Sequence, residues 1–210
     1  NVSSLREIAR ARNLRDKARI GNSSLVIGLL SSGLIAVSLT GSSQFLLPHF
    51  DNYDRLRPVL FYLSLSIIPI TLFTILGFCL QGLGKLVVSM LVLSILHNLF
   101  IILFCWMSPP SDSTDISLIY LLGAFLVLLA GFFLYHSAVG NQFYGFLLDK
   151  KLFSGSFSLL ISQSLGQFYT HFPIFVLGYN ATPPDIAIFT TCIKLSIVIG
   201  FVLMAMRIVA

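Results

Sequence analysis

The chain has 210 residues, of which 56% are apolar and only 10% are charged, and its mean hydropathy is +0.92. A soluble domain carries about a quarter charged residues, so this composition excludes an ordinary water-soluble globule and predicts that lipid surrounds most of the outer surface. The net charge of +5 does not indicate a nucleic-acid-binding protein, because six of the thirteen basic residues fall in the first nineteen positions and the rest lie mainly between apolar runs.

The chain begins with a basic, polar segment, residues 1–22. Ser4 and Glu7 have the spacing of a capping box, and apolar and basic residues then recur at helical spacing from Leu5 to Arg15. This pattern predicts a helix. It is read equally well as a basic helix at the cytoplasmic membrane surface or as a solvated connector helix.

Six apolar runs follow, each about as long as a helix must be to cross a hydrocarbon core of about 30 Å. The first five contain no Asp, Glu, Lys or Arg. Because lipid cannot satisfy free backbone polar groups, we expect each run to be helical. The sequence therefore predicts an all-α membrane protein, a polytopic bundle of six transmembrane helices. The runs are 23–47, 59–80, 86–107, 117–136, 154–178 and 186–209.

The connections between the runs predict the orientation, because Lys and Arg mark the cytoplasmic side. With the N-terminus inside, ten basic residues fall in cytoplasmic segments and only Arg55 and Arg57 fall in the opposite ones. We therefore expect the N-terminus of this segment on the cytoplasmic side. The ten are Arg6, Arg10, Arg12, Arg15, Lys17, Arg19, Lys85, Lys150, Lys151 and Arg207.

Strongly polar residues within the runs are the candidates for a substrate-binding cavity, because such groups are costly at membrane depth. His97 and Asn98 lie in the middle of the third run. Lys194 lies about nine residues into the sixth run, and it faces either a water-filled cavity or an ion pair between helices.

The fifth run carries a polar stripe, since Gln163, Gln167 and His171 recur every four residues and share one helix face. The stripe either holds helices together or lines a pathway. Pro173 in this run and Pro69 in the second are candidate kinks or hinges. Gly82 and Gly84, in the tight link from Gln81 to Lys85, predict a sharp hairpin.

No catalytic constellation is recognisable in the sequence. The four histidines lie on different runs or loops, and the three cysteines (Cys79, Cys105 and Cys192) lie far apart in apolar segments. Such cysteines are read as small buried apolar residues. The sequence thus predicts no metal site, no cofactor and no enzymatic activity.

Two stretches of the chain carry family-like motifs. The first runs from Pro58 to Pro69 and on to Leu80-Gln-Gly-Leu-Gly-Lys85. It resembles the fourth span of polysaccharide (O-antigen type) flippases, of the multidrug/oligosaccharidyl-lipid/polysaccharide exporter superfamily. Phe175-Val-Leu-Gly-Tyr179, followed by the stretch 185–196, is similar to their hairpin between spans seven and eight. The motif positions there are filled by Asp185, Ala187, Phe189, Lys194 and Leu195. Pro173 departs from the pattern, because many members carry an aspartate there.

The resemblance implies two six-helix bundles around a central cavity, working by alternating access. The chain would correspond to spans three to eight, and so to part of a longer protein. Residues 23–136 would supply four helices of the N-terminal bundle and residues 154–210 the first two of the C-terminal bundle. The segment 137–153 would be the cytoplasmic linker between them.

The implied function is movement of a lipid-linked oligosaccharide, a polysaccharide repeat unit, across a bacterial cytoplasmic membrane. Lys194 would meet the anionic diphosphate or sugar acids, and Arg207 would lie nearer the cytoplasmic mouth. Expected partners are this substrate, membrane lipids, a proton or sodium coupling ion and polysaccharide polymerase machinery, with no nucleic acid. An ion-coupled organic-cation antiporter is the alternative, and a membrane-embedded lipid-linked transferase is a weaker one.

Overall fold

The computed structural model describes Ile8, residues 13–46 and 53–140, and then Leu165, 168–169, 171–174, 176–177, Thr182 and 184–195. Within these residues every regular element is helical and no strand occurs, which confirms the all-α class. The chain divides into two units, Asn1–Ser156 and Phe157–Ala210. The predicted linker, 137–153, ends close to this division, but most of it lies outside the described residues.

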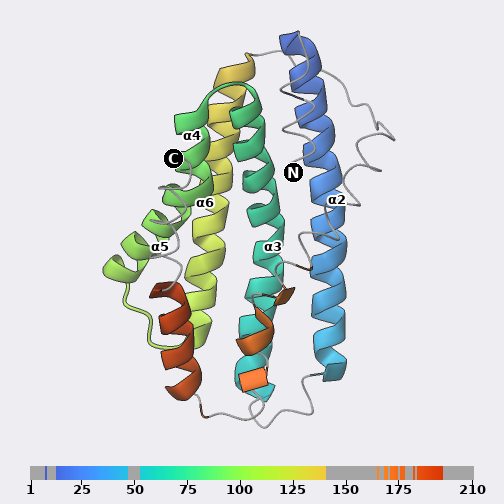
Figure 1. Cartoon of the computed structure of the whole chain (residues 1–210). Coiled ribbons are helices and arrows are strands. Elements are labelled where there is room, and N and C mark those ends of the chain that lie inside the picture. The colour runs from blue at the N-terminus through green and yellow to red at the C-terminus, as the bar shows by residue number, and fades with distance from the viewer. Residues whose placement is uncertain are drawn as a thin grey trace. The chain divides into compact units, whose positions relative to one another are not determined.

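Four helical segments of the first unit match the first four predicted spans (Figure 1). They are α2 (Leu14–Leu46), α3 (Tyr53–Gly82), the continuous run of α4 (Leu86–Met90), η2 (Leu91–Ile95) and α5 (Leu96–Met107), and α6 (Ser113–Val139). Each is long and apolar enough to cross a membrane. In the second unit, 171–174 and 184–195 are helical, and much of the predicted fifth and sixth spans lies outside the part that the structure describes.

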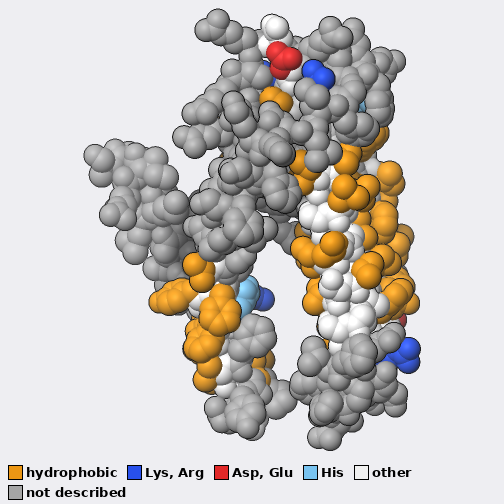
Figure 2. Space-filling model, turned by 90° about the vertical axis from the view of Figure 1, so that its right-hand side faces the viewer, with side chains coloured by type: hydrophobic (Ala, Val, Ile, Leu, Met, Phe, Trp, Pro, Cys, Tyr) orange, Lys and Arg blue, Asp and Glu red, His pale blue; other side chains and the backbone are white. Residues whose placement is uncertain are grey.

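The surface of the first unit is apolar where a lipid-facing surface is expected. Leu34, Val37 and Trp106 are 69%, 74% and 83% exposed. A contiguous apolar surface of this kind marks contact with a membrane or with another protein. On the face that Figure 2 displays, apolar side chains cover the middle of this unit, and the described charged side chains lie toward its ends. The pattern is that of an integral membrane protein.

Helix α2 begins earlier than the first predicted span. It starts at Leu14 and continues through Gly21 and Asn22 without a break, so the predicted boundary between residues 1–22 and the span falls inside one helix. The hydroxyls of Ser23 and Ser24 donate to the carbonyls of Arg19 and Ile20, both at 2.9 Å. These serines are therefore satisfied within the helix and do not interrupt it. The predicted capping residues Ser4 and Glu7 lie outside the described residues.

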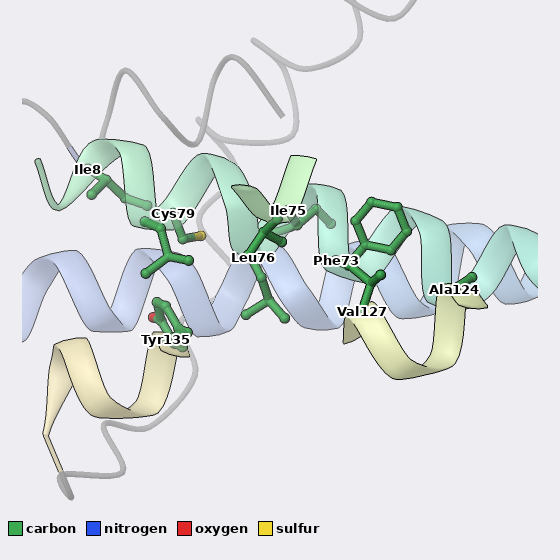
Figure 3. Close-up of a cluster of buried hydrophobic side chains, with 10 residues drawn as sticks. Ile8, Phe73, Ile75, Leu76, Cys79, Ala124, Val127 and Tyr135 are labelled. Carbon is green, nitrogen blue, oxygen red and sulfur yellow. The ribbon is translucent and has the colours of Figure 1, made fainter. Parts of the chain in front are cut away.

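Helix α3 is the centre of the first unit, because it packs against α2 on one side and against α6 and α4 on the other (Figure 1). Its Phe73, Leu76 and Leu80 form the core together with Val92 of η2 and Val127 of α6 (Figure 3). Ile8, which is 1% exposed, also belongs to this cluster. The helix runs without interruption across Pro69, whose side chain is buried.

The link between α3 and α4 is a Schellman motif. Gly84 adopts a φ of +83°, which strongly favours glycine. Its N–H donates to the Gln81 carbonyl and the Lys85 N–H donates to the Leu80 carbonyl, both at 3.0 Å. The two bonds satisfy the last carbonyls of α3 and reverse the chain within three residues. Gly82, the other predicted hinge glycine, is the last residue of α3.

Candidate functional site: a polar position in the third span

The third span is not a uniform α-helix. Residues Leu91–Ile95 form a π-helical turn, in which the Leu96 N–H donates to the carbonyl of Leu91, five residues earlier. Such turns widen a helix by one residue and occur often at functional sites. Sequence analysis misses this turn, because Leu91-Val-Leu-Ser-Ile95 contains no proline or glycine to signal it.

The π-turn packs closely on α3, and a glycine makes room for it. A Cβ added at Gly77 would lie 2.5 Å from Cγ of Leu93, far inside ordinary contact. Val92, the residue before, is fully buried in the core. The turn is therefore held by specific contacts and is not a frayed end.

His97 lies two residues after the π-turn, at the junction of three helices. The centroid of its ring is 4.7 Å from that of Tyr120 on α6, edge to face, and 5.6 Å from that of Phe73 on α3. Its Nε2 lies 3.5 Å from the Tyr120 carbonyl oxygen, a long hydrogen bond. The imidazole is half-buried. It can exchange hydrogen bonds at a depth where few polar side chains occur.

Asn98 is exposed, and its side chain is tied back to the π-turn. Its Nδ2 donates to the carbonyl of Ser94 at 2.9 Å. Successive residues of a helix differ by about 100° in direction, so His97 and Asn98 occupy neighbouring faces of α5. His97 therefore packs against residues of α3 and α6, while Asn98 bonds to the π-turn of its own span.

Ser89 lies on the same span, two residues before the π-turn, and its hydroxyl is a further polar group. Its hydroxyl is buried and, within the part of the chain that the structure describes, has no hydrogen-bond partner. A buried hydroxyl left without a partner costs about 1–3 kcal/mol. The segment from Ser89 to Asn98 therefore combines an unsatisfied hydroxyl, a π-turn and two polar side chains in the middle of an apolar span.

The other predicted cavity residues belong to the second unit. Lys194 lies in the helical stretch 184–195 and is exposed, and His171 and Pro173 lie in the helical stretch 171–174, both exposed. These three residues belong to the second unit, which is described separately from the unit that contains His97. Gln163, Gln167 and Arg207 lie outside the described residues. No group of three metal-ligating side chains occurs among the residues searched, which are the described ones.

No family model matches the chain, and no curated protein and no solved structure is significantly similar to it. The resemblance to polysaccharide flippases therefore stays a prediction from the motifs.

Proposed function

We propose that this protein is part of a membrane transporter that moves a lipid-linked oligosaccharide across a bacterial cytoplasmic membrane by alternating access. The observation that carries the proposal is the third span, where a π-turn is followed at once by His97 and Asn98. Polar side chains and irregular backbone inside a span are costly, and they are found mainly where a pathway or a moving helix requires them. The motifs from Pro58 to Lys85 and around Lys194 support the choice of substrate.

The third span can adopt two conformations, one with the π-turn and one in which the turn is α-helical. Conversion of the π-turn to α-helix changes the local register by one residue, which turns the segment on one side by about 100° relative to the other. That rotation exchanges the faces presented by His97 and Asn98. It also gives a new environment to Ser89, whose buried hydroxyl has no partner among the residues that the structure describes. A helix that rotates in this way would couple the polar residues of the span to opening and closing of the cavity.

The second unit would supply the positive charge for the substrate. Lys194 would pair with the diphosphate that links the sugar to its polyprenyl carrier, and Arg207 would attract it at the cytoplasmic mouth. Gln163, Gln167 and His171 would line the path, and a proton or sodium ion would drive the cycle. In a flippase of this kind, the N-terminus of this segment would lie in the cytoplasm. Polysaccharide polymerase machinery would then use the transported repeat unit.

The experiment is complementation in a strain that lacks the gene. Deletion should abolish surface polysaccharide and cause lipid-linked oligosaccharide to accumulate. The gene carrying Lys194→Ala or His97→Ala should fail to restore the polymer, while Lys194→Arg should restore it at least in part. Ile102→Ala is the control, because Ile102 lies on the same helix as His97 and is 69% exposed.

Normal surface polymer in the deletion strain, with efflux of organic cations lost instead, would replace the flippase proposal by the antiporter. Full restoration of surface polymer by both Ala variants would show that neither His97 nor Lys194 takes part in transport.

A further inference from the structure

The first unit contains an apolar groove that the proposed transport path does not use. It has a volume of about 330 Å³, and its lining exposes only apolar surface. Its lining includes Val26 and Leu29 of α2, Leu72 and Leu76 of α3, and Leu129 and Phe132 of α6. Leu29 is 48% exposed and Leu129 is 65% exposed, so the groove opens outward between α2 and α6.

The groove is closed at one end by a contact between its two walls. The hydroxyl of Tyr135 on α6 donates to the carbonyl of Ala18 on α2 at 3.4 Å, in a buried position. Gly21 allows this approach, because an added Cβ would overlap the Tyr135 hydroxyl. Cys79 of α3 lies buried beside the same contact (Figure 3). A chain lying in the groove cannot pass between α2 and α6 at this contact, so a polar end on this side leaves the groove outward at the level of Ala18 and Tyr135.

Basic side chains surround this closed end. Arg19 follows Ala18 directly, is exposed, and lies seven residues before Val26, which places both on one face of α2. Lys17 lies in the same turn of α2. His136 follows Tyr135, and its ring centroid is 6.4 Å from that of Phe132 in the groove wall.

Lys85 and Asp16 are the other charged side chains described at this end of the unit. The start of α2 and the end of α3 lie at the same end of the unit (Figure 1), which brings Lys85 there as well. Asp16, exposed on α2, is the one carboxylate among the described side chains at this end. Three cations outnumber it, so this end attracts anions. At the other end, the described acidic side chains Asp112 and Asp115 outnumber Arg57.

We propose that the groove binds an acyl chain of an anionic phospholipid whose phosphate is held by Arg19, with Lys17 and His136 beside it. Seven residues of helix separate Arg19 from Val26 by about 10 Å, so a chain in the groove leaves its headgroup at the guanidinium. Since the lining exposes only apolar surface and the charged side chains described at the basic end are mainly cationic, the occupant is an apolar chain that carries an anionic headgroup.

The test compares lipids retained by the purified protein in native mass spectrometry. Dioleoyl phosphatidylglycerol and dioleoyl phosphatidylcholine are the probes. The wild-type protein should retain phosphatidylglycerol at least tenfold better. Arg19→Gln should reduce that preference at least fivefold, while Arg57→Gln, at the opposite end, should leave it unchanged.

Filling the groove tests the acyl chain separately from the headgroup. Leu29→Trp and Leu129→Trp enter it from α2 and α6, at exposed positions where a larger side chain is tolerated. Either should abolish retention of both lipids. Leu34→Trp, exposed elsewhere on α2, should bind lipid as the wild type does.

Equal retention of the two lipids by the wild type would overturn the headgroup assignment. Unchanged binding in both groove variants would overturn the site, and so would a protein dimer that Leu29→Trp dissociates, because a second copy would then occupy the groove. None of these outcomes depends on whether the protein transports oligosaccharide.

Discussion

Most of the buried or half-buried hydroxyl side chains described in the first unit donate to carbonyls of their own helices. Ser66 donates to the carbonyl of Leu63 at 2.7 Å, and Thr71 donates to that of Ile67 at 2.8 Å. Thr40 and Ser64 share a hydrogen bond of 2.9 Å that joins α2 to α3. In an apolar solvent each such bond removes a polar group that water cannot reach. Among the described residues, Ser89 carries a hydroxyl that is buried and has no hydrogen-bond partner.

Ser89→Ala should raise the free energy of unfolding by about 1 kcal/mol, because it removes a buried donor without breaking a hydrogen bond. Unfolding in mixed micelles measures this. Ser66→Ala is the matched control, since Ser66 is equally buried but bonded, and it should lower stability or leave it unchanged. A loss of stability in Ser89→Ala larger than that in Ser66→Ala would show that the hydroxyl has a partner in the folded protein.

The π-turn depends on one close contact between elements, that of Leu93 with Gly77. In an ordinary helical position, Gly→Ala stabilises by about 1 kcal/mol. At Gly77 the new methyl would press on Leu93 at 2.5 Å. Gly77→Ala should therefore destabilise the protein by about 1–3 kcal/mol through overpacking.

Gly33→Ala is the control for this prediction, because nothing lies within 4 Å of the added atom, and it should be neutral or stabilising. Adding Leu93→Ala to Gly77→Ala should recover much of the loss in a double-mutant cycle. Purely additive effects would mean that the two residues do not touch.

The turn itself can be removed by deleting a residue. A π-turn holds one residue more than the α-helix around it, so deletion of Leu91 should yield a regular helix with α4 and α5 still in their contacts. Stability should change by no more than about 1 kcal/mol, while transport should be lost if the turn drives the rotation of His97 and Asn98.

Deletion of Ile102, in the regular part of α5, is the contrasting variant. It should turn the rest of that helix by about 100° and impair folding, as near-ultraviolet circular dichroism would show. Equal damage from the two deletions would contradict the assignment of the extra residue to the π-turn.

At the scale of the whole molecule, hydropathy is enough to predict the spanning elements of the first unit. The third predicted span, 86–107, has the same bounds as the observed helical run. Helix α2 begins nine residues before the first predicted span, and α3 and α6 extend beyond the second and fourth predicted spans at both ends. Polar residues such as Asp16 and Lys17 continue a helix beyond the apolar run that hydropathy marks. Gly84 was predictable as a turn residue, since its left-handed conformation favours glycine.

The site was predictable only in part. The depth of His97 follows from its place in an apolar run, but its neighbours Tyr120 and Phe73 come from other helices and depend on packing that no local pattern records. The π-turn and the buried Ser89 have no sequence signal. The groove forms where three helices meet. Its basic end could not be located from the sequence, because that requires knowing that Tyr135 contacts Ala18.

The central claim is that these helices cross a membrane with the turn at Lys85 on the cytoplasmic side. Cysteine accessibility tests it most directly, in a variant whose Cys79, Cys105 and Cys192 are replaced by Ala. A membrane-impermeant maleimide should label Ser111→Cys in intact cells. It should label Lys85→Cys only after the membrane is permeabilised, because α4, η2 and α5 separate the two positions by one full span. Labelling of both positions from the same side would contradict the account.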